Sequence, residues 1–419
     1  MNEIASLWGN RIYVRMFSAF SISIFGVYLD MIAVATLVSY TWKSDPIIIS
    51  LIPIAYALPM ILFGSWAGVL SDRLKKLRIM IIADVLIAIV TFILVFVPNV
   101  YWLLLLLAVR STFASFFQPA HQALTKQVVH EHHLAQATSW NGLMDQVGRI
   151  AGPLLGAMLI TGLSPQISMS VRGVSSLCSA FILLSISKMV KDKKQFEQIQ
   201  KKERQGFFSA WLEGWKYVWN RKIIFYTMFY GLCGVGILQL VESQVPVLMR
   251  ELFPNSPEMV GWINAIVGLG GVCGVWLIKR IGELKYGWFL GGGIALIGLG
   301  FGSLGLFTET TPIFFTFVIG FIAGIGSGLF FISFNIILQK ETDIETAGRV
   351  FGIQSSLSNL MFIVPPLIGG VFVKLIGVSQ VYVWIGSAMF LLGGIGIIFR
   401  NKIWKTEMVV EKVKQVTSL

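Results

Sequence analysis

Long apolar runs separated by short polar segments dominate this chain. Twelve of the runs are long enough to cross the hydrocarbon of a bilayer as a helix, which takes about 20 mostly apolar residues. They cover roughly residues 14–37, 47–70, 78–97, 101–120, 139–162, 168–188, 223–247, 259–278, 286–307, 312–336, 350–374 and 379–399. The pattern predicts an all-α integral membrane protein with twelve transmembrane helices.

The composition supports this fold class. The chain has 419 residues, of which 55% are hydrophobic and 13% are charged, whereas an average soluble domain carries about 25% charged residues. An ordinary globule of this composition would leave many apolar side chains in water. We therefore expect the lipid bilayer to surround most of the protein.

Basic residues are distributed unevenly over the connections between the runs. With a cytoplasmic N-terminus, 27 Lys and Arg residues fall on the cytoplasmic side and four on the outside, namely Lys43, Arg172, Arg250 and Lys374. Such an excess marks the cytoplasmic side of a membrane protein. We predict a multi-pass protein of the cytoplasmic membrane with both termini cytoplasmic. The formal net charge of +12 then reports topology and not a nucleic-acid partner.

The two halves of the chain resemble each other. The segment PLLG at 153–156 matches PLIG at 366–369, and Lys126 matches Lys340, at offsets of 213 and 214 residues. The repeat predicts two pseudo-symmetric six-helix halves at 1–190 and 223–400, a cytoplasmic linker at 191–222 and a cytoplasmic tail at 401–419. This architecture is typical of transporters, whose substrate site lies near the midplane between the halves.

A charged segment, GVLSDRLKKLR, connects the second and third runs. Its G-x-L-S-D-R pattern resembles the loop motif of the major facilitator superfamily. Gly68 permits a close helix contact, and Asp72 is suited to face the positive N-terminus of another helix. The resemblance implies a cytoplasmic gate made by Gly68, Asp72 and Arg73, with span eleven, beginning near Arg349, as the partner. The alternative is that the segment is only a topology signal.

The fifth run contains a glycine stripe. Gly148, Gly152 and Gly156 recur every four residues, which permits a close helix contact, and Pro153 removes a backbone donor. The pattern resembles the span-five motif of family members that exchange substrate for protons. We expect span eight to supply the complementary surface through its own glycines, Gly268, Gly270, Gly271 and Gly274.

Charged side chains inside the apolar runs are costly and mark candidate functional positions. Asp30 lies late in the first run, Arg110 in the fourth and Glu242 late in the seventh. The family resemblance implies that spans one, four, seven and ten line a central cavity, so these three side chains are predicted to face one space. Asp30 is the first candidate for an unpaired proton carrier, with Arg110 resetting it, and Glu242 is the second. The alternative for Glu242 is a solvated position near the outer interface.

The remaining polar groups receive structural interpretations. Asp145 and Arg149 are four residues apart, and this spacing predicts an intrahelical ion pair between them within the membrane. Asp84 is predicted to be the structural partner of a nearby base. The histidine cluster of the segment HEHHL is predicted to be a solvated helix start and not a metal site; it contains His130, His132 and His133.

The whole chain resembles the macrolide-efflux and enterobactin-exporter branch of the superfamily. The resemblance implies a secondary transporter, acting as a monomer, that couples efflux of small amphipathic or drug-like molecules to the proton gradient, as multidrug or macrolide resistance proteins do. No cofactor is expected. A nucleotide-binding G-x-x-x-x-G-K loop is absent, so the expected partners are substrate, protons and lipid. The alternatives are an importer on the same fold and a lipid-handling membrane protein. An enzyme is not expected, because no acid, base and nucleophile share one membrane depth.

Overall fold

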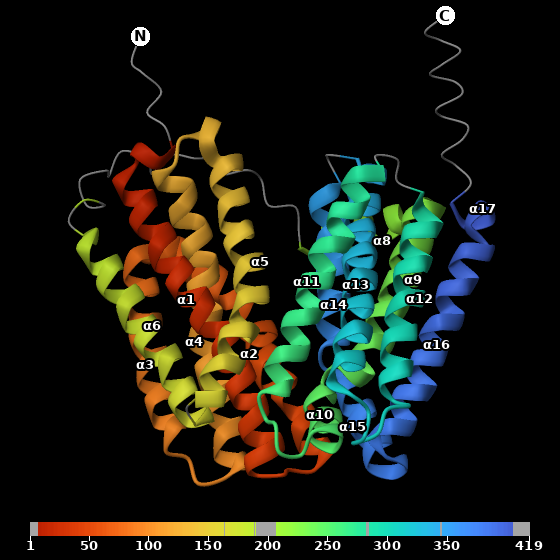
Figure 1. The fold of residues 1–419 in the computed structure, drawn as a ribbon. Coiled ribbons are helices and arrows are strands. Elements are labelled where there is room, and N and C mark those ends of the chain that lie inside the picture. Colours follow the sequence, from red (N-terminus) through yellow and green to blue (C-terminus); the bar gives the residue numbers. More distant parts are fainter. Residues whose placement is uncertain are drawn as a thin grey trace, which may run out of the picture. The chain divides into compact units, whose positions relative to one another are not determined.

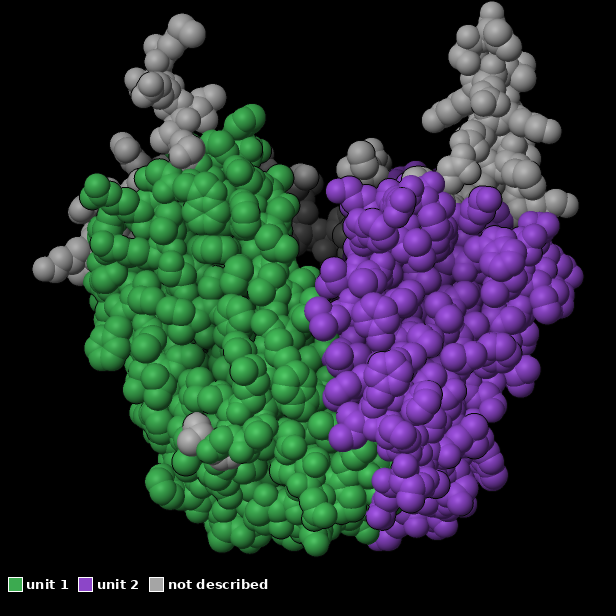
Figure 2. Space-filling model, viewed as in Figure 1, with its two compact units in different colours: residues 1–200, 249–265 green, residues 201–248, 266–419 purple. Residues whose placement is uncertain are grey.

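The structure of the chain is a computed structural model that describes residues 7–162, 164–187, 189, 207–281, 285–343 and 346–404, with the side chains of residues 65, 68–73, 207–211, 347 and 348 outside this description. The described regular structure is entirely helical. The chain forms two compact units, one made by residues 1–200 and 249–265 and the other by residues 201–248 and 266–419 (Figure 2). The predicted second half, 223–400, therefore differs from the second unit at residues 249–265, which pack with the first unit.

Six long helices make up most of the first unit (Figure 1). Side chains that accept hydrogen bonds from backbone N–H groups at the N-terminus fix three of the starts: Asn10 before α1, Asn99 before α4 and Ser164 before α6. The helices are α1 Arg11–Thr36, which continues as a π-helix over Leu37–Thr41, α2 Pro46–Arg73, α3 Lys76–Val95, α4 Val100–Val128, α5 Glu131–Gly162 and α6 Pro165–Ser185.

The second unit contains more and shorter helices. They are α8 Phe207–Asn220, α9 Lys222–Glu242, α10 Val245–Leu252, α11 Met259–Ile281, α12 Tyr286–Leu304, α13 Ile313–Glu341, α14 Ala347–Met361, α15 Val364–Ile376, α16 Val378–Ile398 and α17 Arg400–Ile403; the first residues of α11 and the last of α10 belong to the first unit. Glycines bring several of these helices into backbone contact. A Cβ at Gly293 of α12 would lie 2.7 Å from the Phe330 nitrogen of α13, and one at Gly298 would lie 2.6 Å from the Gly386 oxygen of α16.

Eleven helical segments of the described chain are long and apolar enough to cross a membrane. Each corresponds to one of the twelve predicted runs. The remaining run, 139–162, lies in α5, which is 32 residues long. Asp145, Gln146 and Arg149 lower the apolar character of α5, which explains why it differs from the others. Predicted span eleven is divided into α14 and α15.

Candidate functional site

Four charged side chains among the described residues of the first unit are buried, on four different helices. Asp30 of α1 is 1% exposed, Asp84 of α3 is 0% exposed, Arg110 of α4 is 4% exposed and Arg172 of α6 is 6% exposed. A charge removed from water is tolerated only when it is paired and hydrogen-bonded. The partners of these four groups therefore define the candidate site.

Asp30 and Arg110 form a two-pronged ion pair. Nη1 of Arg110 donates to Oδ1 of Asp30 at 3.0 Å, and Nη2 donates to Oδ2 at 2.5 Å. The planar guanidinium fork matches both carboxylate oxygens, which makes this the strongest geometry for such a pair. Because the two residues are 80 positions apart in the chain, the ion pair joins α1 to α4.

Two further helices complete the coordination of this ion pair. The hydroxyl of Tyr56 in α2 donates to Oδ2 of Asp30 at 3.1 Å and accepts from Nη2 of Arg110 at 3.0 Å. Oγ1 of Thr91 in α3 accepts from Nη1 of Arg110 at 3.4 Å. A change in the charge of Asp30 would therefore be felt by α1, α2, α3 and α4 together. We call Asp30, Tyr56, Thr91 and Arg110 the buried polar cluster.

The sequence singled out Asp30 and Arg110 but not their pairing. The prediction that Asp30 is an unpaired carboxylate is wrong, because Arg110 contacts both of its oxygens. Tyr56 and Thr91 were missed. The only sequence signal for them is a hydroxyl in an apolar run, which is too common in membrane helices to identify a site.

The other two buried charges form hydrogen bonds with neutral groups. Nη1 of Arg172 donates to the carbonyl of Ser23 at 2.7 Å and to its hydroxyl at 3.0 Å. Ser179 donates to Oδ2 of Asp84 at 2.6 Å, while Oδ1 of Asp84 has no hydrogen-bond partner in the described structure. Asp84 thus hydrogen-bonds to a serine, and the nearby base, Arg172, interacts with it electrostatically without a direct hydrogen bond. Arg172, counted among the outside bases, is a buried residue of α6.

The predicted ion pair between Asp145 and Arg149 does not form. The ion pairs of the described residues do not include it, and Asp145 instead accepts a hydrogen bond from the Tyr28 hydroxyl of α1 at 3.3 Å. Arg149 is exposed. Glu242, the last residue of α9 in the second unit, is also exposed, in keeping with the solvated alternative.

The glycine stripe of α5 contacts α1. A Cβ at Gly152 would overlap the side chain of Tyr28, and one at Gly148 would lie 3.2 Å from the same ring. A Cβ at Gly156 would lie 3.4 Å from Cβ of Ile32. The prediction that the span-eight glycines supply the complementary surface is wrong, because those of α11 face α13: a Cβ at Gly270 would lie 2.9 Å from the Ile325 nitrogen. Pro153 lies inside α5 without ending it.

The predicted gate residues lie in the last turns of α2. Gly68, Asp72 and Arg73 are helical there, and their side chains lie outside the described part of the chain. Arg349, near the predicted partner helix, forms an ion pair with Glu213 of α8 at 2.8 Å.

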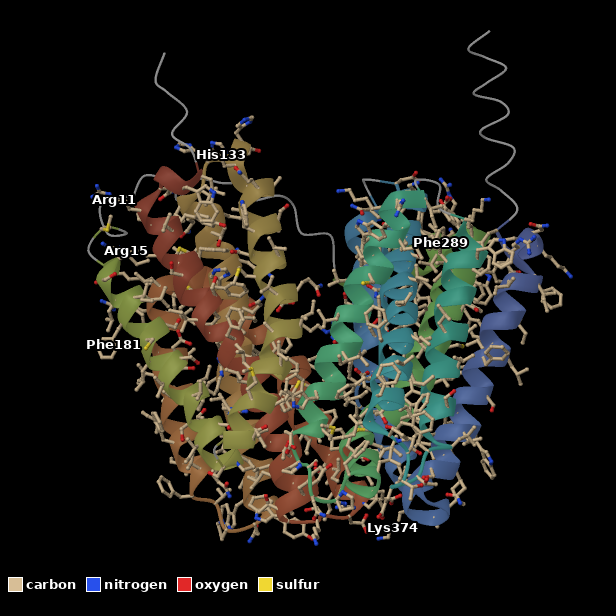
Figure 3. All side chains as sticks on the ribbon, in the orientation of Figure 1. Arg11, Arg15, His133, Phe181, Phe289 and Lys374 are labelled. Carbon is tan, nitrogen blue, oxygen red and sulfur yellow. The ribbon has the colours of Figure 1, made fainter. Side chains whose placement is uncertain are left out.

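One end of the first unit carries basic side chains. In the first unit, Arg11, Arg15 and His133 lie at one end, and Phe181 of α6 points outward with 68% of its surface exposed (Figure 3). The described residues contain no group of three or more His, Cys, Asp or Glu side chains that could hold a metal ion. The His132 and His133 rings contact each other at 5.3 Å.

Sequence comparisons match these features to a known family. The family model described as "Major Facilitator Superfamily" matches residues 15–364. The chain belongs to this superfamily. It is 28% identical over 384 residues to the uncharacterised MFS-type transporter YfiS of Bacillus subtilis, covering 90% of both chains. It is also 27% identical to the putative bacilysin exporter BacE of Bacillus subtilis, over 82% of this chain and 83% of the relative.

A third relative and a solved structure agree with this assignment. Macrolide efflux protein A of Streptococcus pyogenes is 23% identical, over 80% of this chain and 83% of the relative. The crystal structure of the nucleoside transporter NupG, as its D323A mutant, matches 93% of this chain and 99% of its own with a TM-score of 0.71 at 14% identity. The chain is therefore a multi-pass membrane transporter of small molecules and not an enzyme.

Proposed function

We propose that this transporter exports small amphipathic molecules across the cytoplasmic membrane in exchange for protons. The observation that carries the proposal is the ion pair between Asp30 and Arg110, buried in the first unit and bridged by Tyr56. The relatives named as a bacilysin exporter and a macrolide efflux protein support the direction of transport and the class of substrate.

The buried polar cluster suits proton coupling because its charges balance only when Asp30 is ionised. A proton on Asp30 removes the counterion of Arg110 and leaves the guanidinium charge uncompensated in a site with almost no water. That state is expensive, so protonation favours a rearrangement of the four helices that hold the cluster. A cationic substrate group approaching Asp30 would favour release of the same proton, because a nearby positive charge stabilises the ionised carboxylate. Once ionised, Asp30 is again the counterion of Arg110.

The orientation follows from the distribution of basic residues. Both termini are proposed to be cytoplasmic, with the proton gradient as the energy source, no cofactor and a monomer as the working unit. With the three native cysteines replaced by serine, a cysteine at the exposed Asn255 should react with an impermeant reagent from outside, and one at the exposed Lys402 should not. The opposite labelling pattern would reverse the orientation.

The end of α2 is proposed to act as the cytoplasmic gate. Asp72 supplies a negative charge next to the basic residues of the GVLSDRLKKLR segment, and Gly68 and Arg73 flank it. The proposal is supported by the match of this segment to a family whose model covers it. It is independent of the coupling role of Asp30.

An efflux panel tests the proposed function. Cells lacking their native pumps would express the chain and be loaded with amphipathic dyes and macrolides, and retention would be measured before and after collapse of the proton gradient. The proposal expects lower retention of at least one compound and loss of the difference on collapse. Export that persists without a proton gradient, or accumulation in place of export, would contradict it. An Asp145→Asn variant is the matched control, because that carboxylate lies in the same unit but outside the cluster.

A further inference from the structure

The membrane span formed by α14 and α15 is interrupted in its middle. Helix α14 ends at Met361 and α15 begins at Val364, and Figure 1 draws them as separate helices. Pro365 and Pro366 follow the interruption directly. Because proline has no N–H group, neither can donate to the carbonyl four residues earlier, so the carbonyls of Met361 and Phe362 lose their helical donors.

The exposed face of α14 is polar up to its last turn, where Leu360 is also exposed. Gly352, Ser355, Ser356 and Asn359 are exposed and recur at helical spacing, and a Cβ at Gly352 would meet no atom within 4 Å. The opposite face, with Val350 and Ile353, is buried. Polar side chains of a membrane span normally face protein or a water-filled cavity, so this polar face of α14 is not a surface for lipid.

Helix α15 of the same span has the expected lipid-facing pattern. Its exposed side chains are apolar except for Lys374 in the last turn; the apolar ones are Val364, Ile368, Val371, Phe372, Leu375 and Ile376. The exposed surface therefore changes from mainly polar to mainly apolar over residues 360–364. Irregular backbone at membrane depth is tolerated where it lines a water-filled path or is buried in protein. The polar face of α14 is thus suited to water and solute, not to hydrocarbon.

The groups at this position are mainly hydrogen-bond acceptors. The two carbonyls without helical donors lie at the C-terminal, negative end of α14, which favours a cation. The two prolines remove the donors that the start of α15 would otherwise offer. The described structure gives Ser355 and Asn359 no hydrogen-bond partner within the protein, so both side chains are available to a ligand.

We infer that the polar face of α14 and the interruption at residues 361–364 form a binding site for the protonated, N–H-bearing group of a transported amine. This inference deepens the proposed function and rests on it only in taking the substrates to be small amphipathic molecules. Binding at this site needs no proton gradient, so it can hold or fail independently of the coupling role of Asp30.

A pair of rhodamine dyes tests the inference. The rhodamine methyl ester with free amino groups and tetramethylrhodamine methyl ester share their ring system and charge, but only the first has N–H donors. Binding of both to the protein in nanodiscs would be followed by fluorescence anisotropy without a gradient, with empty nanodiscs subtracted. We expect the N–H-bearing dye to bind about fivefold to tenfold more tightly, as one or two hydrogen bonds to a cationic donor allow.

Two variants should reduce this preference toward one. Asn359→Leu removes a side chain of the polar face without touching the core, and the double change Pro365→Ala and Pro366→Ala restores N–H groups that engage the free carbonyls. Asn335→Leu is the matched control, since Asn335 is exposed on α13 and donates only to the Phe331 carbonyl at 2.8 Å. An equal affinity for both dyes, no binding of either dye, or a preference unchanged in both variants would overturn the inference.

Discussion

The two units differ in whether they bury charged side chains. The first buries Asp30, Asp84, Arg110 and Arg172, whereas the buried polar side chains of the described second unit are all uncharged. Glycines of the second unit, such as Gly293 and Gly298, bring its helices into backbone contact, whereas the glycines of α5 in the first unit mainly meet side chains of α1. The first unit therefore holds the buried ionisable groups, and the second unit relies on backbone contacts between its helices.

One position makes this difference concrete. The offset of 214 between Lys126 and Lys340 aligns Arg110 with Gly324. In the first unit this position of α4 carries the guanidinium that neutralises Asp30. In the second unit the position of α13 leaves no room for a side chain, because a Cβ at Gly324 would lie 2.9 Å from the backbone of Gly270. The same place in the repeat thus serves charge pairing in one half and helix contact in the other.

The largest effect is expected from removing one partner of the buried pair. Arg110→Met leaves the Asp30 carboxylate buried without a counterion, which should cost about 3–5 kcal/mol of stability and abolish transport. The loss of stability is measured as the fall in unfolding temperature in detergent, with size-exclusion chromatography of heated samples as the readout. The double variant Asp30→Asn with Arg110→Met removes both charges and should recover most of the stability. A stable Arg110→Met protein would show that the pair is not a structural element of the first unit.

The second largest effect is expected from removing the Tyr56 hydroxyl, which bridges Asp30 and Arg110. Tyr56→Phe keeps the ring and removes hydrogen bonds to both charged groups, so we expect a loss of about 1.5–3 kcal/mol and slower proton-driven efflux. Thr91→Val, at the longer contact of 3.4 Å, should have a smaller effect. If Tyr56→Phe behaves like the wild type in both assays, the cluster reduces to Asp30 and Arg110.

The glycine contacts of the second unit predict a purely structural defect. Gly324→Ala places a methyl group against the backbone of α11, and overpacking of this kind costs about 1–3 kcal/mol. Gly292→Ala on the neighbouring α12 is the control, because a Cβ there meets no atom within 4 Å. Unfolding temperatures should fall for the first variant and stay constant for the second. Equal stability of both variants would remove the contrast drawn between the units.

The smallest effect on stability is expected at the end of α2. Asp72→Asn keeps the shape of the side chain and removes its charge, so unfolding should change by no more than about 0.5 kcal/mol. Transport should nevertheless fall several-fold if the carboxylate acts in a gate. Efflux at wild-type rates by a well-inserted Asp72→Asn protein would reduce the segment to a topology signal.

The helical membrane fold was predictable from the sequence, because the hydropathy of the chain alone locates the membrane spans. Rare charges in apolar runs also identified Asp30 and Arg110. Their pairing was not predictable, because it depends on how α1 packs against α4, and periodicity within one helix carries no such information. For the same reason the glycines of α5 were given the wrong partner helix. The interruption of span eleven had a local signal in Pro365 and Pro366, but a single proline in α5 leaves that helix continuous.

The most direct test of the account is the uphill transport of substrate by Asp30→Asn in proteoliposomes. The variant keeps hydrogen-bonding groups at this position but cannot take up and release a proton in the transport cycle. Using a compound identified by the efflux panel, we expect wild-type protein to concentrate it when a proton gradient is imposed. Asp30→Asn should lose this activity and still exchange the compound down its own gradient. Concentration of the compound by Asp30→Asn under the same gradient would contradict the claim that the buried polar cluster couples transport to protons.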